Sequence, residues 1–264
     1  VPMLHDVVPS EIASSGPLTD TFEMSWMSPT ITSGPTLGEQ GGGGTKIEDD
    51  NSPFVPNEFV GSFRMEMHVF DGTTEQKNSP TNMRYWSAED KTMNKMEMPE
   101  DPGSSPGGRD MRMMTDLKGK WQYTLMTDEK GKKTAMKSKK KKVTMGEEGK
   151  GKDAEVTETA ETKTIEGHTC TKTIVKSEDG TWTGWVAKDL KAPFADMARS
   201  VGHRGEDKMM KSYKGMGFPL EFEWVGTKGD HMVCYVKELN VGPVDAGVFS
   251  LDGYEVTEMP SFGQ

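Results

Sequence analysis

The sequence predicts a β-rich α+β domain built on an antiparallel sheet, preceded by an extended N-terminal leader. From residue 58 onward, short segments with alternating apolar and polar residues follow one another with turn residues between them, as is typical of an antiparallel meander. Hydrophobic residues make up only 33% of the chain and its mean hydropathy is −0.70, so the apolar residues must be concentrated in one part of it. We therefore expect a leader over residues 1–57 and a domain over residues 58–264.

The leader is rich in Pro, Gly, Ser and Thr, a composition that is ordinarily disordered. Within residues 21–27, however, Phe22, Met24 and Trp26 occupy alternate positions, which places them on one face of an extended strand. Such a strand needs a sheet to pack on. These three residues and Ile31 are therefore the candidate assembly residues.

The domain begins with its clearest strand, residues 60–70, where Phe63, Met65 and Met67 alternate with polar residues and so form one buried face. Residues 155–166 are compatible with helix or strand, and threonines at alternate positions favour strand. The other expected strands span residues 82–87, 92–98, 110–117, 121–128, 132–137, 168–177, 181–188, 220–225 and 231–239.

Residues 192–214 form the one segment with a helical pattern, and we expect a break near Gly202. Pro193 suits the first turn of a helix, where its missing N–H is not needed. Phe194, Met197 and Val201 share one face at helical spacing, so this face is expected to pack on the sheet.

Five short phrases, at residues 83–86, 165–172, 185–190, 217–221 and 253–256, together resemble an uncharacterised family of exported bacterial domains. That family is related to the periplasmic lipoprotein carriers of the LolA/LolB type. The resemblance covers residues 58–262 and implies a strongly curved antiparallel sheet, an incomplete barrel, with helices on its concave side. It also implies an exported location, extracellular or periplasmic. It supplies no catalytic residues, and lipid binding is an analogy at the level of the fold.

Charge and residue patterns exclude several classes of function. The chain has 32 Lys and Arg against 42 Asp and Glu, a net charge of −10, which makes nucleic acid an unfavourable partner. No apolar run approaches the roughly 20 residues of a transmembrane helix. The five histidines are scattered, and neither a nucleophile elbow nor a phosphate loop is present. We therefore expect a non-enzymatic protein with no cofactor, no metal and no transmembrane segment.

The 21 methionines are the most unusual feature of the composition. Methionine fills irregular cores and lines adaptable apolar cavities, and the strand spacing of many of these residues favours such a role. A set of Met and His residues would also suit Cu(I). In a strand, however, His68 points away from Met65 and Met67, so copper is only a minor alternative. The candidate ligand cavity consists of Met65, Met67, Met113, Phe194, Met197 and Val201.

Three further features are interpreted as structural. Cys170 and Cys234 lie on strands expected to be separated by two others, about 14 Å apart and beyond the reach of a disulfide, so we expect free thiols. The acidic run 48–51 lacks the ligand spacing of a calcium loop and is expected to be a solvated hinge. The basic run 137–142 is expected to be a solvated edge strand, with contact to anionic lipid or an acidic polymer as the alternative.

Two functions fit these observations. In the first, an exported structural subunit self-assembles, its leader packing as an added strand on the sheet of a neighbouring copy, and head-to-tail repetition gives a filament. The leader could instead fold back on its own domain. In the second, the protein is a carrier or binding module for a lipid or other apolar ligand in the concave sheet. The first is favoured narrowly, because the leader lies outside the region of resemblance.

Overall fold

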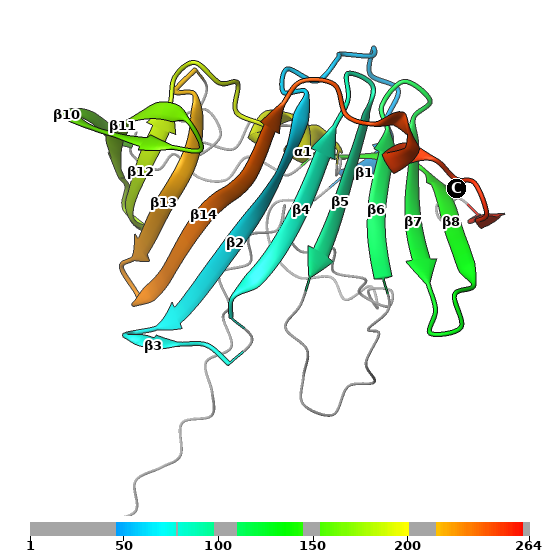
Figure 1. The fold of residues 1–264 in the computed structure, drawn as a ribbon, viewed down its shortest axis with the longest axis horizontal. Coiled ribbons are helices and arrows are strands. Elements are labelled where there is room, and N and C mark those ends of the chain that lie inside the picture. The colour runs from blue at the N-terminus through cyan, green and yellow to red at the C-terminus, as the bar shows by residue number, and fades with distance from the viewer. Residues whose placement is uncertain (1–45, 78, 98–109, 145–153, 201–214, 261–264) are drawn as a thin grey trace, which may run out of the picture.

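The computed structural model describes residues 46–77, 79–97, 110–144, 154–200 and 215–260. In these residues thirteen strands form one large sheet and two form a small separate sheet (Figure 1). The large sheet has the strand order β10-β11-β12-β13-β14-β2-β4-β5-β6-β7-β8-β15, and the short β3 pairs with β2 outside this path. The prediction of a β-rich fold is confirmed.

The strands follow the expected segments closely where the apolar and polar residues alternate. The large sheet comprises β2 (Gly61–Asp71), β3 (Thr74–Glu75), β4 (Thr81–Ser87), β5 (Lys91–Glu97), β6 (Asp110–Asp116), β7 (Trp121–Thr127), β8 (Lys133–Lys139), β10 (Glu155–Ile165), β11 (His168–Lys176), β12 (Gly180–Ala187), β13 (Phe218–Gly226), β14 (Asp230–Val241) and β15 (Glu255–Glu258). The small sheet pairs β1 (Lys46–Asp49) with β9 (Lys141–Thr144), and the helical elements are α1 (Phe194–Ser200) and the 3-10 turn η1 (Ala246–Phe249).

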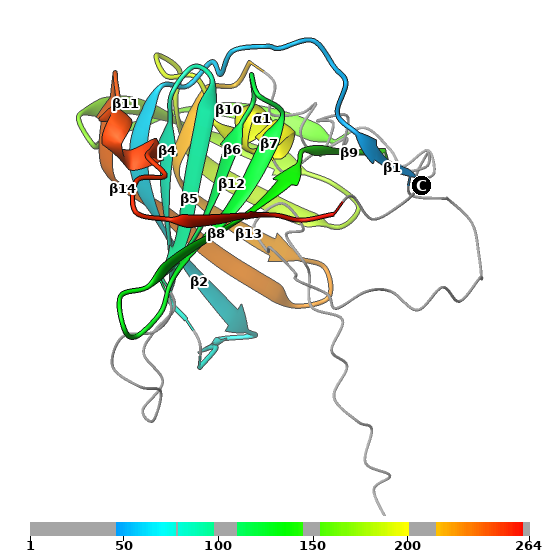
Figure 2. The ribbon, with the colours of Figure 1, turned by 90° about the vertical axis from the view of Figure 1, so that its right-hand side faces the viewer.

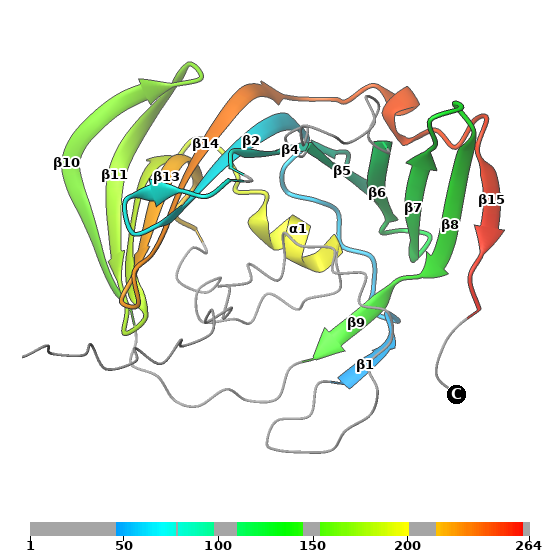
Figure 3. The same cartoon turned by 90° about the horizontal axis from the view of Figure 1, so that it is seen from below.

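The large sheet is strongly curved but is not closed into a barrel (Figure 3). Among the described strands, β10 and β15 form its two edges, and β15 alone runs parallel to its neighbour, β8. Two runs of antiparallel neighbours, β10 to β14 and β2 to β8, join where β14 pairs with β2. The curvature gives the sheet a concave side, which holds α1, and a convex side (Figure 3).

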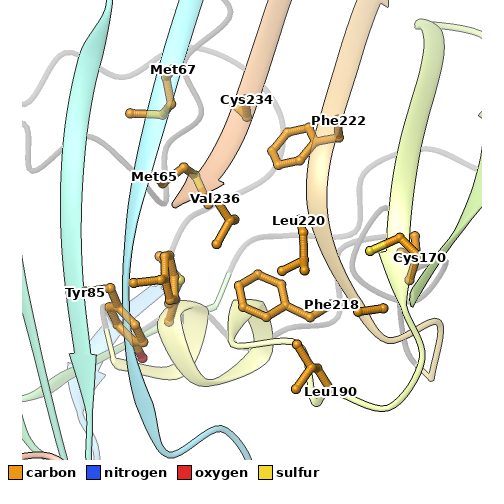
Figure 4. Packing of buried hydrophobic residues seen from close by; sticks show 14 of the residues in the cluster. Met65, Met67, Tyr85, Cys170, Leu190, Phe218, Leu220, Phe222, Cys234 and Val236 are labelled. Carbon is orange, nitrogen blue, oxygen red and sulfur yellow. The ribbon is translucent and has the colours of Figure 1, made fainter. Parts of the chain in front are cut away.

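The main hydrophobic core lies on the concave side. Met65 is aligned with Met83 on β4 and with Val236 on β14, and Phe63 is aligned with Tyr85. All five side chains are at most 3% exposed. Figure 4 shows three of them, Met65, Tyr85 and Val236, within this layer. The alternation read from residues 60–70 therefore does form a buried face.

The helix α1 covers part of this core. Pro193 precedes it, and the Pro193 carbonyl accepts a hydrogen bond from Met197 N at 2.8 Å, as expected for a first turn. The Phe194 ring packs edge-on against Phe218, with 6.0 Å between the ring centroids. The helix is described as far as Ser200. The expected break near Gly202 and the rest of the predicted segment, residues 201–214, lie outside the described residues.

A smaller core lies on the convex side of β5 to β8. Residues 244–254 cross these strands, and β15 then joins the edge of β8 (Figure 2). Phe249 is 8% exposed and packs in one cluster with Met93, Met114 and Leu125. The convex face of these strands is therefore covered by the C-terminal segment.

Candidate functional site

The concave face is divided into two halves, and the first carries the main core. Met65, Met67 and Met197 from the predicted ligand cavity lie in this core, with exposed fractions of 0%, 6% and 4%. Phe194 is half-buried and packs against the same cluster. Four of the predicted cavity residues are therefore packing residues of the interior in this structure. Val201 lies outside the described residues.

The second half of the concave face, over β6 to β8, carries four half-buried methionines that we call the methionine shelf: Met111, Met113, Met126 and Met136. The strand register places Met111 directly opposite Met126, and it places Met113 and Met136 on either side of Thr124. Opposed residues of an antiparallel pair share a face, as do residues two apart on a strand. The four side chains therefore project from one side of the sheet.

The register also shows which side this is. Met113 is aligned with Asn94 on β5, and Asn94 is aligned with Tyr85, which lies in the concave core. None of the four shelf methionines belongs to either hydrophobic core cluster of the described residues. The polar residues interleaved with them, Thr124 and Thr134, are uncharged. The shelf is thus an apolar, adaptable surface on the concave side.

Sequence reasoning found one member of the shelf, Met113, and missed the other three. A signal for them was present in the hairpin turns. The turn at Lys118 and Gly119 connects Asp116 with Trp121, which are aligned, and the same register brings Met111 opposite Met126. Counting outward from the predicted turns would therefore have shown the cluster.

The C-terminal end of α1 borders the shelf. The Ser200 carbonyl accepts hydrogen bonds from Thr115 Oγ1 at 3.3 Å and from Gln122 Nε2 at 2.9 Å. Thr115 and Gln122 are aligned with each other and lie two residues from Met113 and Thr124 on the same face. This contact therefore lies between the part of the concave face that carries the main core and the part that carries the shelf.

The assembly residues predicted from the leader, Phe22, Met24, Trp26 and Ile31, lie outside the described residues. The structure does describe the last part of the predicted leader. We call residues 46–59 the strap, because they run from β1 to the start of β2 over the end of α1 (Figure 3).

The strap is bound to the lysine run by ion pairs. Asp50 accepts a hydrogen bond from Lys140 Nζ at 2.6 Å, and the two side chains are 8% and 2% exposed. Asp49 forms a more exposed pair with Lys141 at 2.7 Å. The predictions of a solvated hinge at residues 48–51 and of a solvated edge strand at residues 137–142 are therefore wrong. Each run is locally polar, but the two neutralise one another once β1 pairs with β9.

The electrostatics of Asp50 follow from this geometry. Burial opposes ionisation of its carboxyl group, but hydrogen bonds from Lys140 Nζ and Ser52 N outweigh that effect. Together they hold the pKa of Asp50 well below its ordinary value. The Asp50 carboxylate is therefore charged at neutral pH. Burial lowers the pKa of Lys140, and the hydrogen bond to Asp50 opposes this change.

The strap is also fixed to α1. Asp196 Oδ2 accepts hydrogen bonds from Glu58 N at 2.9 Å and Phe59 N at 3.0 Å. Arg199 donates to Asp196 Oδ1 at 2.6 Å and to Asn57 Oδ1 at 3.2 Å. Burial raises the pKa of Asp196, although these donors oppose the change. The leader consequently joins the domain at a fixed point, Lys46 on β1.

The free edge of the sheet at β10 is a less suitable surface for an added strand. Most of its residues are exposed, and among the described residues it pairs only with β11. It carries Glu155, Glu158 and Glu161, and its register shifts between Glu158 and Thr162. Charges and bulges are the features that protect natural sheet edges from unplanned pairing.

The sequence analysis also singled out the two cysteines and His68. Cys170 and Cys234 are free and buried, as predicted, and burial raises the pKa of both thiols. His68 lies on the opposite face from Met65 and Met67, between Glu66 at 3.2 Å and Glu75 at 2.6 Å. Among the described residues, no group of three or more His, Cys, Asp or Glu side chains is placed to hold a metal ion.

Fold and surface together define a β-rich domain with an open, curved sheet whose concave face is half closed by its own elements. The chain belongs to the family described as a domain of unknown function (DUF4412), whose model matches residues 59–252. No curated protein matches it. In the described part of the chain, no helix has the length and apolar character needed to cross a membrane.

Two solved structures similar to the chain are those of PNGF-II, in C2 and P21 space groups. Each is 12% identical and covers 76% of this chain, with TM-scores of 0.34 and 0.35. The chain spans about a third of their length, 31% and 32%. Similarity at this level identifies neither the fold nor the function of this chain.

Proposed function

We propose that this protein is a non-enzymatic, exported structural subunit that self-assembles, with the leader of one copy packing on the sheet of the next. The observation that supports this best is the half-closed concave face. The C-terminal segment covers the convex side of β5 to β8, whereas the methionine shelf on the other side of the same strands belongs to neither core of the described part of the chain. A leader strand that is apolar on one face complements such a surface.

The resemblance to LolA/LolB-type carriers belongs to this proposal, and it supports both the incomplete-barrel architecture and the exported location. Head-to-tail repetition of the leader contact produces an open filament, because each copy supplies one strand and receives another. No catalytic step is required of any residue.

The test compares two triple variants of the full chain. Phe22→Ala, Met24→Ala and Trp26→Ala together remove the apolar face of the leader strand. The matched control replaces Thr21, Glu23 and Ser25 with alanine on the opposite face of the same strand. Size-exclusion chromatography and negative-stain electron microscopy should show loss of assembly in the first variant only. Equal assembly of both variants would refute the proposal.

A truncation experiment must leave the strap, residues 46–59, intact. Deletion of residues 1–57 would remove Asp50 and Asn57 along with the leader, and would leave Lys140 buried without its partner. Deletion of residues 1–45 removes the leader and keeps these contacts. This shorter deletion therefore separates loss of assembly from loss of stability.

A second candidate is a carrier for a lipid or other apolar ligand, and the observation in its favour is the methionine shelf itself. Methionine side chains adapt to ligands of varied shape, and the interleaved threonines add no charge. Native mass spectrometry of gently purified protein should then show a bound acyl lipid. Met126→Gln should weaken binding of a fluorescent fatty acid, and Met126→Leu should preserve it. Equal binding by both variants would place the ligand elsewhere.

A further inference from the structure

We propose that the methionine shelf is the surface on which residues 21–27 of a neighbouring copy dock, with Phe22, Met24 and Trp26 facing the shelf. This inference rests on the proposed self-assembly and assigns the two surfaces that make the contact. Three arguments support the pairing: side-chain chemistry, charge, and the point at which the leader leaves the domain.

The chemistry of the two surfaces is complementary. Thioether sulfurs make favourable contacts with aromatic rings, and the leader strand presents two such rings, Phe22 and Trp26. Side chains two apart on an extended strand are separated by about 7 Å. The same spacing separates Met111 from Met113 on the shelf, so successive leader side chains match successive shelf positions.

Charge favours the shelf over the free edge of the sheet. Residues 1–45 contain five acidic residues and neither Lys nor Arg. The strand at the free edge, β10, carries Glu155, Glu158, Glu161 and Lys163. Glu158 and Glu161 are already paired with Lys188 and Lys172, so an added acidic strand would compete with them for these lysines. The polar residues of the shelf, Thr124 and Thr134, are neutral. An incoming leader therefore meets no like charge on the shelf itself.

The exit point of the leader lies at the shelf end of the sheet. Lys46 is on β1, which pairs with β9, and only Lys140 separates β9 from the shelf strand β8. Twenty residues lead from Trp26 to Lys46, and such a segment spans up to about 70 Å when extended. A compact chain of this size has a radius of gyration of about 18 Å. The leader is therefore long enough to reach the shelf of an adjacent molecule.

Cysteine crosslinking in the full chain tests the contact. One variant carries Met24→Cys, a second carries Met126→Cys on the shelf, and a control carries Thr127→Cys, the next residue on β7, which faces the other side. The native cysteines are both 0% exposed and do not compete. After mixing and oxidation, a covalent dimer should form between the Met24→Cys and Met126→Cys chains, and much less with the Thr127→Cys chain.

A second set of variants keeps the test informative if a cysteine variant folds poorly. Met126→Gln should weaken assembly about tenfold, whereas Met126→Leu and the control Thr127→Gln should leave it close to wild type. Equal assembly of Met126→Gln and Met126→Leu would overturn the shelf as the docking surface.

The outcomes separate this inference from the proposed function. Filaments or oligomers that form without the Met24–Met126 link leave self-assembly standing and overturn the shelf contact. If the mixture gives no covalent dimer, while a chain that carries both Met24→Cys and Met126→Cys forms the link internally, the neighbour is overturned as the source of the strand, and self-assembly through the leader with it. A shelf that is inaccessible with or without the leader, covered by an acyl ligand or by residues 201–214, also overturns the contact.

Discussion

Replacing Lys140 with methionine is expected to destabilise the domain far more than an ordinary surface substitution. Its amino group contacts Asp50 at 2.6 Å, and the two side chains are only 2% and 8% exposed. The substitution leaves the Asp50 carboxylate buried, with Lys120 at 3.9 Å as the remaining nearby cation. Removing one member of a buried ion pair typically costs about 3–5 kcal/mol of unfolding free energy. For a chain of this length, that loss corresponds to a melting temperature lower by on the order of 10 °C.

The assay is urea unfolding followed by tryptophan fluorescence, with two matched variants. Asp50→Asn combined with Lys140→Met removes both charges and should recover most of the lost stability, because no charge is then buried alone. Asp49→Asn removes a pair of similar length, 2.7 Å, whose side chains are a third or more exposed, and it should have little effect. If Lys140→Met costs no more than Asp49→Asn, burial does not determine the strength of this contact and the reasoning is refuted.

The same pair sets a pH dependence. Because the folded-state pKa of Asp50 is depressed, its contribution to stability is fully present above the ordinary aspartate pKa of about 3.9 and is lost as pH falls towards the folded-state value. Acid titration should therefore lower the stability of wild type relative to the variant with both charges removed as pH falls below that value. A difference that stayed constant down to acid unfolding would contradict a charged Asp50.

Three further predictions concern other parts of the domain. Phe249→Ala should lower the unfolding free energy by about 3–5 kcal/mol in the same urea assay, because the ring is 8% exposed in the convex core. A loss below about 1 kcal/mol, the size expected for a surface substitution, would mean that the C-terminal segment is not packed there. Cys170 and Cys234 should both fail to react with Ellman's reagent in the folded protein and both react in urea, and rapid reaction of either thiol in the native state would contradict its burial. Burial opposes protonation of His68, but Glu75 and Glu66 outweigh this effect and raise its pKa. The loss of stability caused by His68→Gln should therefore be present below a pH of about 6.5 and disappear as pH rises through the folded-state pKa. Thermal melts across this pH range measure it.

Strands with strict alternation could be predicted from the sequence because local patterning determines which face is buried. The run containing Phe63, Met65 and Met67 is one case, and the predicted turns at Gly167 and Gly180 lie at or beside the ends of real strands. The two-strand separation of Cys170 and Cys234 also followed correctly from hairpin order.

What escaped prediction depends on partners that are distant in sequence. Nothing near Lys140 indicates that it is buried, because its partner Asp50 lies ninety positions earlier. The short strand β15 is parallel to β8, so no hairpin turn in the sequence indicates that the two strands pair. The methionine shelf is a property of register across three strands, and no single strand reveals it.

The half-exposed position of the shelf makes its surface sensitive to oxidants. Peroxide converts an accessible thioether to a polar sulfoxide, whereas Met65 and Met83, at 0% and 2% exposure, are shielded. Mild oxidation should therefore leave the folded domain intact while changing the shelf from apolar to polar. After exposure to an oxidising medium, the protein would lose the proposed self-assembly before it lost its fold. Methionine sulfoxide reductase would restore the assembly.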